Sequence, residues 1–188
     1  MYYSSDYVFD GTKDGYVEDD QPNPLNVYGE TKLEAERVIA EILPEAHVAI
    51  RTAWVYGPDE REMNFAIRLV KALEAGDTVR VPADQWGTPT YTEDLADVTL
   101  ALLNDGAAGL FHAVGPDYLS RIDLSERICG AFGLDRELLE PIPTDDLDQG
   151  AARPWRVRMS TAKLDALGLP ARRGVDHGLR DLHAWWTA

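Results

Sequence analysis

Short apolar runs alternate with longer amphipathic segments along the chain. Apolar residues at Val27, Val38 and Ile42 share a helical spacing and Pro44 follows them, which predicts a helix over residues 26–43. The same reasoning predicts helices at about residues 64–75, 92–103, 120 or 123 to 132, and 175–186, and strands at 1–5, 47–54, 78–81 and 109–114. This alternation is typical of a parallel α/β sheet.

The composition is that of a small folded protein. The chain has 188 residues, of which 45% are apolar and 27% charged, so we expect one globular domain, or one domain with a small lobe. No apolar run reaches the ~18 residues of a membrane-spanning helix, and no secretion signal is recognisable. The single cysteine, Cys129, allows no internal disulfide. We therefore expect a soluble, cytoplasmic protein.

The chain is strongly acidic, with 33 acidic and 18 basic residues and a formal net charge of −15. Nucleic acids and anionic membranes bind basic patches, so neither is expected as a partner. Only 4 of the basic residues are lysines. Two explanations stay open: adaptation of the surface to high salt, which screens charge repulsion, and a GC-rich coding bias.

Tyr28 and Lys32 lie four residues apart at the start of the predicted helix 26–43, so their side chains share one face. An ammonium group beside a phenol favours loss of the phenolic proton, which lets a tyrosine exchange a proton with a carbinol oxygen. Taken alone, the spacing fits equally a surface tyrosine beside a solvated lysine. The neighbouring segments favour the functional interpretation.

Six segments, in order along the chain, resemble those of one enzyme family. They are residues 4–11 (SSDYVFDG), 24–32 (PLNVYGETK), 51–57 (RTAWVYG), 64–65 (NF), 84–90 (DQWGTPT) and 153–154 (RP). Together they resemble the extended short-chain dehydrogenase/reductase family, and within it the dTDP-4-dehydrorhamnose reductase branch. Six ordered segments spread over residues 4–154 are not expected by chance.

The resemblance implies a nucleotide-sugar oxidoreductase. Such an enzyme reduces the 4-keto group of dTDP-4-dehydrorhamnose, or of a similar sugar, with NAD(P)H. Tyr28 would give the proton, and Lys32 would assist it and hydrogen-bond the nicotinamide ribose. Ser5 would donate a hydrogen bond to the reacting oxygen and stabilise charge that develops there. Thr52 is implied as a further cofactor-binding residue.

The resemblance also implies substrate-binding residues, namely Asp6, Tyr7, Trp54, Asn64, Gln85 and Arg153. The first two would line the sugar site, and Trp54 would stack beside the sugar or the nicotinamide. The remaining three would hold the nucleotide, with Arg153 using its fork of donors on the diphosphate. Simpler structural roles stay open, with Trp54 as a core residue and Arg153 as a surface cation.

A dinucleotide site of this family also needs a glycine-rich turn after a first strand. The chain contains no G-x-G-x-x-G or G-x-x-G-x-x-G segment. We therefore expect an α/β fold, the C-terminal part of a doubly wound, parallel, Rossmann-type sheet, with a small α/β substrate-binding lobe from about residues 57–95 and 115–175. A strand at residues 1–5 would then have an exposed edge, open to pairing or homo-oligomer formation. A truncated gene product is the favoured explanation, and activity of the chain by itself is left open.

Alternative functions remain. The family includes a non-catalytic relative, the regulatory subunit of methionine adenosyltransferase, so a binding role is one alternative. Sugar-nucleotide epimerases and dehydratases share the Tyr-x-x-x-Lys pair, although residues 84–90 point away from them. No metal site is expected, because the four histidines show no ligand spacing with Cys129. The choice between NADH and NADPH stays open.

Overall fold

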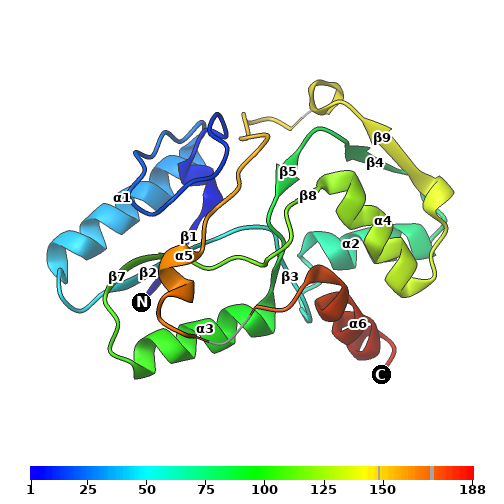
Figure 1. The fold of residues 1–188 in the computed structure, drawn as a ribbon. Coiled ribbons are helices and arrows are strands. Elements are labelled where there is room, and N and C mark those ends of the chain that lie inside the picture. Colours follow the sequence, from blue (N-terminus) through cyan, green and yellow to red (C-terminus); the bar gives the residue numbers. More distant parts are fainter. Residues whose placement is uncertain (148, 170–171) are drawn as a thin grey trace.

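Three parallel strands form the main sheet of the computed structural model, which describes residues 1–147, 149–169 and 172–188 (Figure 1). The strands are β1 (Tyr2–Ser5), β2 (Val48–Thr52) and β7 (Gly109–His112), in the order β1-β2-β7. The register pairs Ser5 with Thr52, so β1 and β2 end side by side. Among the described residues, β1 is bonded to β2 alone and therefore forms an edge of this sheet.

Three helices lie with this sheet on one side of the molecule in Figure 1. They are α1 (Val27–Ile42), α3 (Thr92–Asn104) and α5 (Ala162–Asp165). Val48 and Ile50 of β2 pack with Val98 and Leu102 of α3 in one buried cluster. This burial of alternate β2 residues against a helix is the arrangement expected of a covered parallel sheet.

A second group of elements lies on the other side of Figure 1. It contains α2 (Phe65–Glu74), α4 (Arg121–Phe132), α6 (Val175–Trp186) and the parallel pair β4 (Val79–Pro82) and β9 (Leu139–Ile142). These elements share a separate apolar cluster. Short pairs join the two groups: β3 (Val55–Tyr56) with β6 (Thr90–Tyr91), and β5 (Trp86–Gly87) with β8 (Leu119–Ser120). Three 3-10 helices, η1 (Asp6–Val8), η2 (Arg136–Leu138) and η3 (Thr144–Asp146), complete the elements.

The expected α/β fold is confirmed, and so are the main predicted elements. The Asn26 side chain caps α1 by accepting a hydrogen bond from the Gly29 amide. Ser120 and Asp123 form a capping box at the start of α4. The sequence patterns did not predict β9, because its four residues include Pro141 and are too few to give a periodic signal.

A buried ion pair fastens α1 to the sheet. The Arg51 guanidinium donates two hydrogen bonds to the Glu36 carboxylate, from Nε to Oε1 at 2.9 Å and from Nη2 to Oε2 at 2.7 Å. The Arg51 guanidinium also stacks on the Phe9 ring. Arg51, part of the segment RTAWVYG, therefore has a structural role in this fold.

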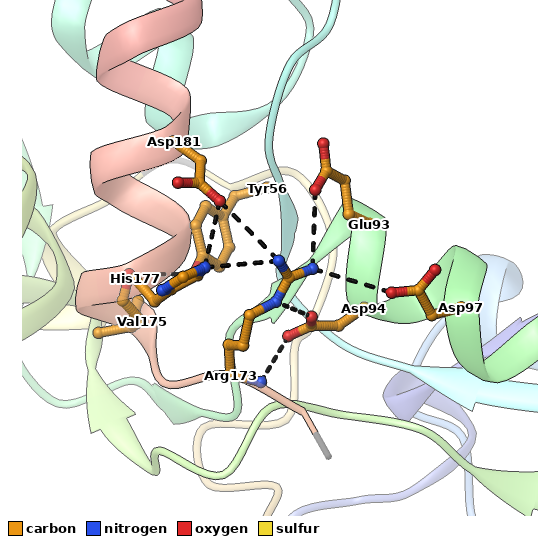
Figure 2. Close-up of polar contacts among 8 residues, drawn as sticks. All are labelled: Tyr56, Glu93, Asp94, Asp97, Arg173, Val175, His177 and Asp181. Atoms are coloured by element: carbon orange, nitrogen blue, oxygen red, sulfur yellow. Dashed lines mark hydrogen bonds and ion pairs between the residues drawn. The ribbon is translucent and has the colours of Figure 1, made fainter. Parts of the chain in front are cut away.

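A cluster of charged side chains fastens α6 to α3 (Figure 2). Arg173, which precedes α6, donates to Asp94 of α3 from its backbone amide at 2.7 Å and from its guanidinium Nε. Glu93, Asp97 and Asp181 surround the same guanidinium at 3.6 to 4.0 Å. The cluster joins the end of the chain to the first group of elements.

Candidate functional site

A cleft of about 790 Å³ lies where β1 and β2 end. Because the two strands are parallel and in register, their carboxyl ends open onto the same edge of the sheet. The cleft is lined by Ser4, Ser5, Asp6, Tyr7, Leu25, Asn26, Val27, Tyr28, Thr52, Ala53, Trp54, Val55, Ala151, Ala152 and Arg153. Seven of the residues predicted from the sequence to bind or react are in this lining: Ser5, Asp6, Tyr7, Tyr28, Thr52, Trp54 and Arg153.

Ser5 orders the turn that follows β1. Its hydroxyl donates to Asp6 Oδ1 at 2.9 Å, and its Oγ accepts a hydrogen bond from the Tyr7 amide at 3.2 Å. Ser5 is thus the N-cap of η1, and the hydroxyl is fixed in direction by two partners. The same bonds position Asp6 and Tyr7 at the floor of the cleft.

Asp6 is a buried carboxyl group in this cleft. Burial raises the pKa of Asp6 to about 6, and the Ser5 hydrogen bond and the positive charge of Arg121 oppose this rise. The carboxyl is 4% exposed. A group with this pKa is ionised above neutral pH and accepts hydrogen bonds from hydroxyl groups there.

Tyr28 and Lys32 lie on the same face of α1, as the spacing predicts. The Tyr28 ring meets the Tyr7 ring edge-on, with centroids 5.5 Å apart, and it is 51% exposed at the mouth of the cleft. Lys32 Nζ donates to the Tyr3 carbonyl at 2.8 Å and lies 5.6 Å from the centroid of the Tyr28 ring. Lys32 itself is outside the cleft lining and places its charge behind the phenol.

Gly29 allows α1 to approach this turn. A Cβ atom at Gly29 would overlap the Tyr7 carbonyl, so the glycine between Tyr28 and Glu30 is required by close backbone contact. The contact brings the Tyr28 side chain to the edge of the Ser5 turn. The Tyr-Gly-x-Thr-Lys segment thus combines a packing requirement with two candidate reactive groups.

Trp54 forms one wall of the cleft in an uncommon backbone conformation. Its φ of 45° lies in the left-handed region, where residues other than glycine are strained. Its ring packs against Gly87, at which a Cβ atom would overlap the indole. The Arg121 guanidinium covers the ring with its Cζ atom 3.5 Å from the ring centroid.

Arg121 is a residue that the sequence patterns did not single out. Burial lowers the pKa of Arg121 to about 10, while Tyr7 and Asp6 counteract this by stabilising the positive charge. Arg121 is the first residue of α4, where a cation opposes the helix dipole. This unfavourable placement is the signal in the sequence that could have marked Arg121 as a functional residue.

Thr52 and Ser4 contribute buried hydroxyl groups at the strand ends. Within the described ranges, neither Ser4 Oγ nor Thr52 Oγ1 has a hydrogen-bond partner in the protein. Buried polar atoms are usually paired, so these two hydroxyls are suited to polar groups of a bound molecule. Both residues line the cleft.

Arg153 lines the cleft from the segment that leads back toward the sheet. Its guanidinium acts on Tyr7, where burial raises the pKa of the phenol and Arg153 opposes the rise. Arg153 also lines an adjoining depression of about 580 Å³, together with Leu25, Gln149 and Trp155. The cleft and this depression adjoin, since Leu25, Ala151, Ala152 and Arg153 line both.

Asn64 and Gln85 do not line the cleft. Asn64 caps α2, since its side chain accepts from the Ile67 amide and donates to the Gly57 carbonyl. Gln85 accepts a hydrogen bond from the Arg121 amide through its carbonyl at 2.8 Å, and its side chain donates to Gln149 Oε1 at 3.2 Å. Gln85 therefore links Arg121 and Gln149, which lie next to the cleft, without lining the cleft itself.

The structure describes residues 1–147, 149–169 and 172–188. No group of three or more His, Cys, Asp or Glu side chains there has an arrangement suited to a metal ion. None of the helices in those ranges combines the length and apolar character needed to cross a bilayer.

Comparison with known proteins gives consistent matches over nearly the whole chain. The family described as "RmlD substrate binding domain" matches residues 1–184. A dTDP-4-keto-6-deoxy-D-glucose reductase of Streptomyces niveus is 36% identical over 189 residues, covering 100% of this chain and 62% of the relative. Methionine adenosyltransferase 2 subunit beta of Xenopus tropicalis is 34% identical over 188 residues, covering 96% of this chain and 56% of the relative.

A solved structure has the same fold. The dTDP-4-dehydrorhamnose reductase of Bacillus anthracis, solved in complex with NADP, superposes with a TM-score of 0.89 and is 27% identical. The alignment covers 98% of this chain and 64% of that one. The chain thus spans between about half and two thirds of the length of these relatives.

Proposed function

Because the chain belongs to the RmlD substrate binding domain family, we propose that its cleft binds a nucleotide-linked 4-keto sugar and takes part in reduction of the keto group. dTDP-4-dehydrorhamnose, or a similar sugar, is the proposed substrate. The observation that carries the proposal is that seven predicted site residues, from four separate segments of the sequence, line one cleft.

The sugar ring would lie between Trp54 and the Ser5 turn. The apolar face of a sugar packs favourably on an indole, and the Asp6 carboxylate would accept hydrogen bonds from sugar hydroxyls. Asp6 and Tyr7 are held by the Ser5 hydroxyl before any ligand binds. This preorganisation reduces the entropy lost on binding.

The keto oxygen would lie within reach of Tyr28 and Ser5. Reduction adds a hydride to C4 and a proton to the oxygen, and Tyr28 would supply the proton from its phenol. The Lys32 ammonium, 5.6 Å from the Tyr28 ring centroid, would stabilise the phenolate left behind. On substrate binding, the Ser5 hydroxyl would turn from Asp6 Oδ1 to the keto oxygen and donate to it as negative charge develops there.

A nicotinamide cofactor, NAD(P)H, fits the same end of the sheet. Thr52 Oγ1, unpaired among the described residues, would hold its ribose end together with Tyr28 and Lys32. The bound cofactor would supply the hydride. The glycine-rich turn that binds a pyrophosphate in this fold is not among the 188 residues, so the residues present fit the nicotinamide end only.

The diphosphate and base would extend toward Arg153. Its exposed guanidinium lines both the cleft and the adjoining depression, and a diphosphate is the ligand that its fork of donors suits best. The substrate lobe in this proposal comprises residues 57–95 and 115–175, with Asn64 and Gln85 acting through the packing of that lobe.

The proposal extends to the partners of the chain. The edge of β1 offers unpaired backbone groups for association with a second copy or with another segment of sheet. We propose a cytoplasmic location, because the proposed substrate, a nucleotide sugar, and the proposed cofactor, NAD(P)H, would both be available there.

Calorimetric titration of the 188-residue chain with dTDP-rhamnose, the product expected from dTDP-4-dehydrorhamnose, tests the proposal. We expect saturable binding, weakened about tenfold or more by Arg153→Met because a charge-assisted contact to the diphosphate is lost. Arg156→Met is the matched control, since Arg156 is a nearby exposed arginine that does not line the cleft. Equal weakening by both variants, or no binding to the unaltered chain, would contradict the proposal.

A parallel titration with NADPH separates the alternatives. Binding of dTDP-rhamnose and NADPH supports a reductase site, whereas binding of the nucleotide sugar alone supports a substrate-binding unit. Binding of neither favours the non-catalytic regulatory role and overturns the proposal made above.

A further inference from the structure

The Trp54 indole is held by two residues that are distant from it in the sequence. Gly87 contacts the ring so closely that a Cβ atom there would overlap it. The Arg121 guanidinium contacts the ring with its Cζ atom 3.5 Å from the centroid, and Arg121 also lies 4.6 Å from the Phe65 centroid. A left-handed backbone at Trp54 persists only when its surroundings determine it, and these contacts do so.

Arg121 is itself fixed in place from several directions. It is the first residue of α4, directly after the capping box of Ser120 and Asp123. Its backbone amide donates to the Gln85 carbonyl at 2.8 Å, which joins it to the strand that carries Gly87. In the part of the chain that the structure describes, its guanidinium forms no ion pair within 4.0 Å. The charge is therefore available to act on the cleft.

The charged and titratable groups around Asp6 come from four segments. They are Tyr7 of η1, Arg121 of α4, Arg153 of the returning segment, and Tyr28 of α1, whose ring contacts Tyr7. Arg121 is the cation that acts on Asp6 directly, and Arg153 acts on Tyr7. Burial raises the pKa of Asp6, and the Ser5 hydrogen bond and the Arg121 charge both oppose that rise.

We propose that Arg121 is a positioning residue of the cleft, which holds the Trp54 indole at the angle that receives the sugar ring and supplies a positive charge that acts on the Asp6 carboxyl. The role in sugar binding rests on the function proposed above, whereas the effects on Trp54 and Asp6 exist without any ligand. Arg121 lies behind the indole and is not in the lining of the cleft. It acts through Trp54 and Asp6.

The ligand-free protein provides the first test. Labelling the five tryptophans with ¹⁵N gives one indole signal each, and Trp54→Phe identifies the signal of Trp54. The Trp54 signal is expected to shift with pH with a midpoint at about 6, as Asp6 ionises. Arg121→Met, which keeps the length and removes the charge, should displace the Trp54 signal and raise the midpoint by about one pH unit.

Two further variants separate charge from stacking. Arg121→Lys keeps the charge and loses the flat guanidinium, so the midpoint should return close to that of the unaltered chain while the signal stays displaced. Arg127→Met, on an exposed arginine of the same helix, should change neither. If Arg121→Met does not fold, Arg121→Lys decides, and an undisplaced Trp54 signal in that variant overturns the proposal.

Ligand binding provides the second test and distinguishes the two proposals. Arg121→Met should lower the affinity for dTDP-rhamnose about tenfold. It should leave the affinity for dTDP unchanged, because only the sugar would contact Trp54 and Asp6. Displaced signals without any binding of dTDP-rhamnose would support the role of Arg121 and contradict the proposed function. A signal and midpoint equal to those of the unaltered chain would overturn the role of Arg121.

Discussion

Asp94 accepts two hydrogen bonds from Arg173, one from the backbone amide at 2.7 Å and one from the guanidinium Nε (Figure 2). The Asp94 side chain is 3% exposed, whereas Asp97, one turn further along α3, lies 4.0 Å from the same guanidinium and is 60% exposed. The two carboxylates thus share one cation but differ in burial and in hydrogen bonding.

This difference predicts unequal effects on stability. Asp94→Ala should lower the free energy of unfolding by about 2–3 kcal/mol, because it leaves a partly buried cation and an amide without their acceptor. Asp97→Ala should lower it by less than about 0.5 kcal/mol. Urea denaturation of both variants checks this, and equal losses would show that the Arg173 cluster does not fasten α6.

The buried His112 predicts a pH dependence of stability. Burial and the nearby Arg51 charge lower the pKa of His112 to about 3, from a reference value of 6.5, and the ring contacts the Ser160 carbonyl at 3.2 Å through Nδ1. The unfolded chain therefore binds a proton at this residue below pH 6.5 while the folded chain does not. The contribution of the depressed His112 pKa to the free energy of unfolding is therefore fully present above pH 6.5. It is lost as the pH falls from 6.5 toward 3.

His112→Gln removes this titration and keeps a donor that can reach the Ser160 carbonyl. Between pH 7 and pH 5, the free energy of unfolding of the unaltered chain should fall by about 2 kcal/mol more than that of the variant. Urea denaturation at the two pH values measures the difference. Parallel losses in both proteins would mean that another group is responsible.

The contact between Gly87 and Trp54 predicts a specific sensitivity to one added methyl group. Gly87→Ala should lower the free energy of unfolding by about 1–3 kcal/mol through overpacking and should shift Trp54 fluorescence. Gly130→Ala is the matched control, since Gly130 lies inside α4 with nothing within 4 Å of a Cβ atom. It should stabilise the protein by up to about 1 kcal/mol. If Gly130→Ala destabilised the protein and Gly87→Ala did not, the close contact between Gly87 and Trp54 would be contradicted.

The proposed proton donor gives a prediction on activity. Tyr28→Phe should slow NADPH-dependent reduction of dTDP-4-dehydrorhamnose by about 100-fold or more, while the affinity for dTDP-rhamnose stays within about twofold. Tyr3→Phe is the control, because the Tyr3 hydroxyl forms a hydrogen bond with Thr99 of α3 and Tyr3 does not line the cleft. Equal rates for the Tyr28 variant and the unaltered chain would exclude Tyr28 as the donor.

The sequence predicted the larger elements because their signals are local. Asn26 and Ser120 cap helices within the same turn, and α6 begins and ends where the apolar periodicity does. The pairs β3 with β6 and β5 with β8 contain two residues per strand, too few for any periodicity, and β9 pairs with a strand about 60 residues earlier. Such elements are fixed by tertiary pairing, which no local pattern reports.

In the candidate site too, residues in recognisable local segments were predicted, and a residue placed by tertiary contacts was not. Ser5, Tyr28 and Trp54 lie in short segments whose resemblance to a family could be recognised, and all three line the cleft. Asn64 was expected in the nucleotide site; the structure shows its side chain capping α2, a role that its position before an apolar helix also fits. Arg121 was missed because its partner, Trp54, is far from it in the sequence, and only the fold brings the two side chains together.

We propose that a nucleotide sugar binds in the cleft at the ends of β1 and β2. The most direct measurement follows the five ¹⁵N-labelled tryptophan indole signals during titration with dTDP-rhamnose. We expect a saturable shift of the Trp54 signal, with the signals of Trp86, Trp185 and Trp186 unmoved because these residues do not line the cleft. A shift of Trp86 with Trp54 unmoved, or no shift of any signal at saturating ligand, would contradict it.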